Sequence, residues 1–170
     1  DLNNNEILKL QKLFDWWDNE IIKNNQIWVK AFNMGWSQFL TDDDLPATNP
    51  PWGYIAKLDL VSGKILWKTP VGYLKKNGEK IKIGTPIFGG LALNGSGILF
   101  ATGTDDNLAY AIDTKTGEEI WSYQMDAAGS APPIIFNYNG KQYVSFVSTG
   151  GRYHNYKEKA SSIYTFGIVE

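Results

Sequence analysis

The sequence predicts an all-β protein made of repeated antiparallel sheets, as in the blades of a β-propeller, preceded by an amphipathic helix. Aromatic residues make up 14% of the chain and include seven tryptophans, which is typical of cores where large rings fill the space between sheets. Short apolar segments alternate with turn residues from residue 54 onward. One strand–turn–strand pattern occurs twice, in residues 57–67 and 111–121.

The two copies, KLDLVSGKILW and AIDTKTGEEIW, share the pattern D-x-x-[ST]-G-x-x-[IL]-W. The aspartates, Asp59 and Asp113, can accept backbone N–H bonds across a turn, and the glycine supplies the positive φ that closes it. We therefore expect both aspartates to be structural. The tryptophan alternates inward on the second strand, where its indole can pack against a neighbouring sheet.

The segment before the repeats has a different character. In residues 4–24 apolar side chains recur at spacings of three and four, which predicts a helix capped by Asn4 or Asn5. Its apolar face packs either on its own protein or on a partner. Residues 27–32 (IWVKAF) predict a strand, and residues 39–53 predict a loop, because they contain three prolines and a DDD triplet that suits a turn better than a cation site.

The remaining elements follow the repeats in order. ILFATG (98–103) predicts an apolar strand that runs into an acidic turn. Before it, Gly89 and Gly90 allow close approach of either a neighbouring blade or a flat ligand. Residues 132–151 predict a hairpin with its turn at NYNG, and residues 162–169 predict a final strand.

Composition excludes several classes of function. The net charge is −2 and the lysines are scattered, which argues against nucleic acid as a partner. The absence of cysteine excludes disulfides and thiolate chemistry. The sequence contains no run of about 18 apolar residues, so it predicts no membrane-spanning helix. Because the chain begins with Asp1, we expect a processed product or a piece of a longer protein.

Three segments carry a resemblance to a known family: PPWGYIAKLDLVSGKILWKTPVG (50–72), residues 84–121 and NGKQYVSFVSTGG (139–151). Together they resemble the C-terminal part of the pyrroloquinoline quinone (PQQ)-dependent dehydrogenases, in the membrane-type glucose dehydrogenase and quinoprotein alcohol dehydrogenase-like family. The resemblance implies an eight-bladed β-propeller, of which residues 50–170 would form about two to three blades. Residues 1–49 would form an N-terminal helix and linker, or an insertion.

The same resemblance implies a chemistry. Family members oxidise an alcohol, aldose or polyol by hydride transfer to PQQ, while Ca²⁺ polarises the quinone carbonyls. The calcium ligands and the catalytic aspartate are expected outside this chain. Because a propeller closes only when its last blade meets its first, the remaining blades must come from another chain or a missing segment. A quinone or cytochrome would accept the electrons, and the implied location is the periplasm, with attachment to the inner membrane through another segment.

Five site residues follow from matching the family's motifs. Asp106 and Asn107 in GTDDN match a D–N pair near the cofactor, so both are cofactor-binding candidates. Gly150 and Gly151 match a glycine pair that lines the funnel near the substrate. Arg152 follows where glucose-oxidising members have histidine; it is a candidate for binding a polar substrate group or a quinone carboxylate, and it argues against glucose as the substrate.

The other polar residues have a structural interpretation. Asp105 is expected in a turn, Glu118 and Glu119 are expected to face solvent, and His154 is expected in a surface loop. Asp106 itself either lies close to the cofactor or only holds a turn. An alternative function follows: a non-catalytic propeller of PQQ-type repeats that acts as a scaffold or interaction module. Retention of GTDDN and of the glycine pair favours the enzyme.

Overall fold

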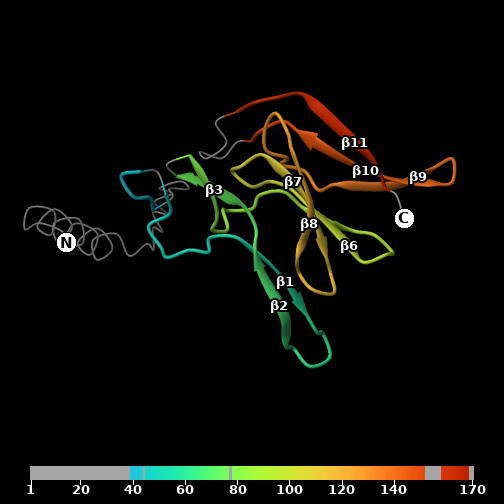
Figure 1. Ribbon diagram of the computed structural model, residues 1–170, viewed down its shortest axis with the longest axis horizontal. Coiled ribbons are helices and arrows are strands. Elements are labelled where there is room, and N and C mark those ends of the chain that lie inside the picture. Colours follow the sequence, from blue (N-terminus) through green and yellow to red (C-terminus); the bar gives the residue numbers. More distant parts are fainter. Residues whose placement is uncertain (1–38, 44, 77, 152–157, 169–170) are drawn as a thin grey trace, which may run out of the picture. The chain divides into compact units, whose positions relative to one another are not determined.

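The computed structural model describes residues 39–43, 45–76, 78–151 and 158–168, and every regular element in these ranges is a β-strand (Figure 1). The chain divides into two compact units, 1–39 and 40–170, and the strands of the described residues belong to the second unit. The predicted helix at 4–24 and strand at 27–32 lie outside the described residues. Within those residues, no helix is long and apolar enough to cross a membrane. The all-β prediction is confirmed.

The largest sheet is a four-stranded antiparallel meander in chain order (Figure 1). Its strands are β5 (Leu91–Leu93), β6 (Ile98–Ala101), β7 (Leu108–Asp113) and β8 (Glu119–Gln124). Each strand pairs with the next through a short connection, which is the arrangement of one complete propeller blade. The predicted strand of ILFATG is thus the second strand of this blade.

Smaller sheets precede and follow the blade. They are the β1 (Tyr54–Leu58) and β2 (Ile65–Pro70) hairpin, the β3 (Tyr73–Lys76) and β4 (Glu79–Lys82) hairpin, and a three-stranded sheet of β9 (Ile134–Tyr138), β10 (Lys141–Ser148) and β11 (Ser162–Ile168) in the order β11-β10-β9. The predicted NYNG turn joins β9 to β10, with Asn139 and Gly140 at φ 50° and 74°. Two positive φ angles in a two-residue loop suit the right-handed twist of a hairpin.

The two sequence repeats have the same local structure. The amide of Gly63 donates to the carbonyl oxygen of Asp59 at 2.8 Å, and that of Gly117 donates to the carbonyl oxygen of Asp113 at 2.7 Å. In each copy the aspartate carboxylate accepts the N–H two residues later, at 2.9 and 2.7 Å. Both glycines have positive φ, 68° and 78°. The ladder register also shifts at the aligned positions 57/58 and 111/112, so the repeat includes a bulge that its sequence did not predict.

The first repeat docks on the turn of the second. Trp67 Nε1 donates to the carbonyl oxygen of Thr114 at 3.0 Å, and Thr69 Oγ1 donates to that of Gly117 at 2.7 Å. The indole lies so close to Gly117 that a Cβ there would stand 2.8 Å from the ring. Trp121, the aligned residue of the second copy, packs instead on Phe166 of β11, with ring centroids 5.0 Å apart. Trp67 also packs against the core that contains side chains of β7, so both indoles pack against a neighbouring sheet, as predicted.

Strand β7 separates two apolar cores because successive side chains point to opposite faces of a strand. One core contains every second residue of β7 with side chains from the preceding segment: Leu108, Tyr110 and Ile112 with Ile55, Val71 and Ala101. The other contains the intervening residues with side chains of the C-terminal sheet: Ala109 and Ala111 with Phe100, Met125, Val144 and Phe146. The four-stranded sheet is therefore packed on both faces, as a blade between two others would be.

Candidate functional site

Three loops that carry the predicted site residues meet at the ends of the strands. They are residues 102–107 between β6 and β7, residues 125–133 after β8, and residues 149–151 after β10. The amide of Met125 donates to the carbonyl oxygen of Asn107 at 2.9 Å, and the amide of Gly150 donates to that of Ala128 at 2.9 Å. The structure thus brings the D–N pair and the glycine pair, about 43 residues apart in the chain, into one connected group of loops.

Asp106 is held entirely by groups of its own chain. Its Oδ2 accepts the backbone N–H of Tyr73 at 2.7 Å and the phenol hydroxyl of Tyr110. Its Oδ1 accepts the hydroxyl of Thr104 at 2.5 Å and the N–H of Leu108 at 3.0 Å. Four donors on two oxygens fix the β6–β7 turn to the start of β3. This geometry gives Asp106 the turn-holding role; its closeness to a cofactor stays a prediction.

Two tyrosines next to Asp106 have a raised pKa. Burial, followed by the negative charge of Asp106, raises the pKa of Tyr110, which is fully buried. Burial and a hydrogen bond to Glu119 raise the pKa of Tyr73 to about 12. Both phenols therefore stay protonated near neutral pH, so Tyr110 serves Asp106 as a hydrogen-bond donor and not as a proton acceptor.

Glu119 is not solvent-facing, contrary to the sequence prediction. Its Oε2 accepts the Tyr73 hydroxyl at 3.0 Å and pairs with Lys82 Nζ at 3.0 Å. The β3–β4 hairpin, which the sequence did not predict, supplies both partners and covers this part of β8. Glu118 is exposed, as expected.

Asn107 has a side-chain oxygen that lacks a hydrogen-bond partner among the described residues. Its backbone lies in the left-handed region at φ 61°, which asparagine tolerates better than most residues. Its side-chain Nδ2 donates to Glu158 Oε2 at 3.3 Å. Its Oδ1 is buried and accepts no hydrogen bond within the described part of the chain. Buried acceptors are nearly always satisfied, so this oxygen requires an explanation.

Gly150 is required by close packing of the same loops. Its φ is 71°, and a Cβ at this position would lie 2.2 Å from the carbonyl oxygen of Glu158. Ser130 Oγ donates to the Gly150 carbonyl. The glycine thus lets the chain segment at 158 approach, and Glu158 in turn contacts Asn107. Sequence reasoning missed Glu158, because nothing in KEKA distinguishes its carboxylate from a solvent-exposed charge.

The structure describes only some of the remaining predicted residues. Gly151 follows Gly150 and is half-buried. Arg152 and His154 lie outside the described residues. At Gly89 a Cβ would stand 2.2 Å from the carbonyl oxygen of Thr102, and at Gly90 it would stand 2.5 Å from Pro132. The sequence predicted that Gly89 and Gly90 allow close approach of either a neighbouring blade or a flat ligand. The structure shows close approach of other segments of the protein.

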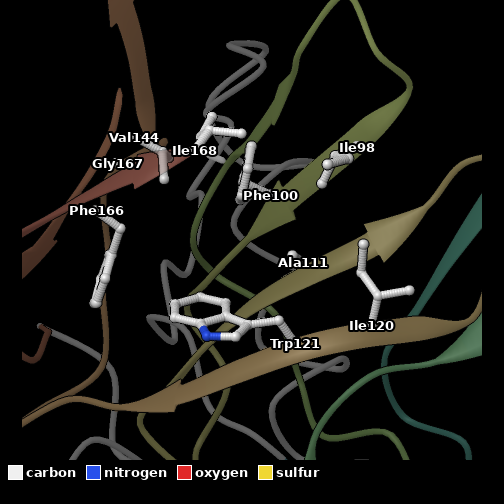
Figure 2. A pocket seen from close by; sticks show the side chains of 9 residues that line it. All are labelled: Ile98, Phe100, Ala111, Ile120, Trp121, Val144, Phe166, Gly167 and Ile168. Carbon is white, nitrogen blue, oxygen red and sulfur yellow. The ribbon is translucent and has the colours of Figure 1, made fainter. Parts of the chain in front are cut away.

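Two cavities lie apart from the loop cluster. An apolar cavity of about 280 Å³ opens between the four-stranded and three-stranded sheets, where Trp121 of β8 faces Phe166 of β11 (Figure 2). Its lining is Ile98, Phe100, Ala111, Ile120, Trp121, Val144, Phe166, Gly167 and Ile168. A polar cavity of about 510 Å³ lies beside Tyr73, Lys82 and Glu119. The apolar cavity is lined by no titratable side chain, so its lining offers no group for acid–base chemistry.

Across ranges 39–43, 45–76, 78–151 and 158–168, no three histidine or acidic side chains gather closely enough to hold a metal ion.

The stacked antiparallel sheets with their repeated Asp–Gly–Trp turns define a segment of a β-propeller. Residues 11–144 match the family model "PQQ: Glucose/ethanol/alcohol dehydrogenase, beta-propeller domain". The chain therefore belongs to the family of PQQ-dependent glucose, ethanol and alcohol dehydrogenase propellers, as the sequence resemblance predicted.

Individual relatives agree with this family. Quinoprotein glucose dehydrogenase A of Acinetobacter calcoaceticus is 32% identical over 120 residues, which cover 67% of this chain and 15% of the relative. The glycerol dehydrogenase large subunit of Gluconobacter thailandicus is 34% identical over 123 residues, 68% of this chain and 16% of the relative. The crystal structure of quinohemoprotein alcohol dehydrogenase from Comamonas testosteroni shares the fold, with a TM-score of 0.54 and 23% identity over 74% of this chain and 18% of its own. The chain thus spans only about a sixth of the length of these relatives.

Proposed function

We propose that this chain is the C-terminal segment, or a subunit, of a PQQ-dependent dehydrogenase that oxidises an alcohol, aldose or polyol. The observation that carries the proposal is the loop cluster: the D–N pair and the glycine pair converge at one end of stacked blades, and the buried Asn107 Oδ1 has no donor within the described ranges. The blades of a propeller surround a central channel, and we place the ligand site there. The cofactor, when bound, supplies the hydride acceptor.

The residues present fit part of a cofactor site. Asn107 offers an amide oxygen that lacks a donor, so it can accept an N–H or O–H of a bound group. Asp106 holds the turn that positions Asn107, since its own oxygens are already bonded four times. Gly150 keeps the opposite loop close. The general base, the Ca²⁺ ligands and the ring-stacking floor would come from the other blades, along with the electron acceptor contact.

The assembly requirement follows from the open sheet edges. Among the described residues, strand β11 is bonded on one side only, to β10, and Ile163 on it is 71% exposed. An unpaired edge strand with exposed apolar side chains favours association. We propose that the remaining blades cover these surfaces, and that the assembled enzyme works in the periplasm and passes electrons to a quinone or a cytochrome.

The test is reconstitution of the assembled protein. The polypeptide that co-purifies with this chain is identified, the complex is loaded with PQQ and Ca²⁺, and dye reduction is followed with ethanol, glucose and glycerol. Turnover of at least one substrate, dependent on PQQ, is the expected result. No turnover and no quinone binding after loading would refute the proposal.

A non-catalytic propeller is the second candidate, because Asp106 can be explained without a cofactor. Its four internal donors account for its presence in GTDDN by turn structure alone. A scaffold predicts a complex that takes up no quinone, so the visible absorbance of the loaded, purified complex separates the two candidates.

A further inference from the structure

The orientation of the Asn107 amide is determined by its neighbour. An asparagine side chain can be rotated by 180° to exchange its oxygen and nitrogen, so its hydrogen-bond partners decide which end faces where. Glu158 presents a carboxylate, which when ionised only accepts hydrogen bonds. Because Glu158 Oε2 lies 3.3 Å from the amide nitrogen, the nitrogen must face Glu158 and the oxygen must face away from it.

The oxygen that faces away is buried. Asn107 Oδ1 has no donor among the described residues. The backbone of Asn107 cannot readily shift, because its carbonyl oxygen accepts the amide of Met125 at 2.9 Å and the side-chain amide of Gln124 at 3.4 Å. The acceptor is therefore held in place and receives no hydrogen bond from the part of the chain that the structure describes, which is an arrangement suited to a donor that arrives with a ligand.

Glu158 is also fixed to the second candidate segment. Its carbonyl oxygen lies against Gly150, at a distance that excludes any side chain there. Nearby, the amide of Ala160 approaches the carbonyl oxygen of Thr149 at 3.5 Å. The carboxylate that orients Asn107 is thus carried by the same loop that closes on the glycine pair.

We propose that Glu158 is a positioning residue that turns the Asn107 amide oxygen toward a bound small molecule, where it accepts an N–H or O–H hydrogen bond. The inference rests on the proposed function, and it adds to it the role of Glu158 and the orientation of the Asn107 amide oxygen. The donor can belong to the quinone or to a hydroxyl of the substrate. The chemistry is the same, and separate binding measurements distinguish the two sources.

The experiment is a double-mutant cycle in the complete protein that contains this chain. Variants Glu158→Ala, Asn107→Ala and the double variant are compared with wild type, with Glu158→Gln as a shape-matched variant and Glu118→Gln as a control at an exposed carboxylate. The quinone Kd is measured by quenching of tryptophan fluorescence with PQQ in the presence of Ca²⁺. The KM and kcat for glycerol, glucose and ethanol are measured by dye reduction, and melting temperatures of the quinone-free variants verify folding.

We expect each single alanine variant to weaken either the quinone Kd or the substrate KM by roughly fivefold, the value of one ordinary hydrogen bond. The double variant should be no weaker than Asn107→Ala, because Glu158 acts through Asn107. Glu158→Gln should fall between wild type and Glu158→Ala, since its amide can present either end. A change in Kd assigns the donor to the quinone, and a change in KM at constant Kd assigns it to the substrate.

Two results would overturn the inference. If the losses of the single variants simply add, or if Glu158→Ala binds as wild type does, Glu158 does not act through Asn107. If wild type itself binds no quinone, the proposed function fails and this inference fails with it. The first result leaves the dehydrogenase intact, so the two failures are distinguishable.

Discussion

Replacing Gly117 by alanine should destabilise the protein far more than the same change at Gly63. Both glycines close the repeated turn with a positive φ, 78° and 68°, so each alanine costs about 1 to 2 kcal/mol in left-handed backbone strain. No atom of the described residues lies within 4 Å of a Cβ at Gly63, whereas a Cβ at Gly117 would lie 2.8 Å from the Trp67 ring. Displacing the indole adds about 1 to 3 kcal/mol of overpacking. We therefore expect a difference of about 2 kcal/mol between the variants.

The assay is urea denaturation of the complete protein, followed by tryptophan fluorescence and by circular dichroism. The pair is matched in turn type, so Gly63→Ala measures the strain and Gly117→Ala measures strain plus docking. Adding Trp67→Ala to each glycine variant should bring their costs closer together, because the contact with the indole is then gone and only the contact with Thr69 Oγ1 at 2.8 Å remains at Gly117. Equal destabilisation by the two glycine variants in the wild-type background would refute the docking argument.

Three further perturbations test other parts of the site. Asp106→Asn places an amide N–H₂ against two hydrogen-bond donors and should cost about 3 kcal/mol in urea denaturation; an unchanged midpoint would contradict the four-donor geometry. The pKa of Tyr73 is raised from 10.0 to about 12, so the folded state holds this proton more tightly than the unfolded state. The contribution of Tyr73 to the free energy of unfolding is complete below pH 10 and is lost as the pH rises toward 12. Tyr73→Phe should therefore reduce the loss of stability between pH 10 and 12, measured by urea denaturation. Gly89→Ala should prevent assembly or cost about 3 kcal/mol, because its Cβ meets backbone at 2.2 Å. Gly95→Ala, in open space, should change stability by less than about 0.5 kcal/mol.

Much of the fold could be predicted because its signals are local. The Asp–Gly–Trp turn needs only a carboxylate, a positive φ and an indole at fixed spacing, and all three can be read in 57–67 and 111–121. The NYNG turn is equally local. The β3–β4 hairpin was missed because YLKKNGEKIK has lysines on both strands and little apolar alternation. The environment of Glu119 depended on that hairpin and could not be predicted without it.

The site was predictable only in part, for a related reason. Motif matching found Asp106, Asn107 and Gly150, and the structure places them in one group of loops. The partner of each is set by tertiary packing: Tyr73 reaches Asp106 from 33 residues away, and Glu158 reaches Asn107 from 51 residues away. No local pattern encodes such pairs. The different roles of the two residues became visible only with these partners: Asp106 holds the turn, and Asn107 Oδ1 has no donor among the residues that the structure describes.

The docking of Trp67 on the next turn has a consequence for assembly. The contact is heterologous: each repeat offers an indole on one side and a turn on the other, so successive repeats can add only head to tail. Such an interface closes into a ring when its rotations sum to a full circle and otherwise extends without limit. The second repeat departs from this rule, since Trp121 packs on the Phe166 ring of β11 and not on a third Asp–Gly turn. The contact between the four-stranded sheet and the β9–β11 sheet is therefore of a different kind from the contact between the two repeats.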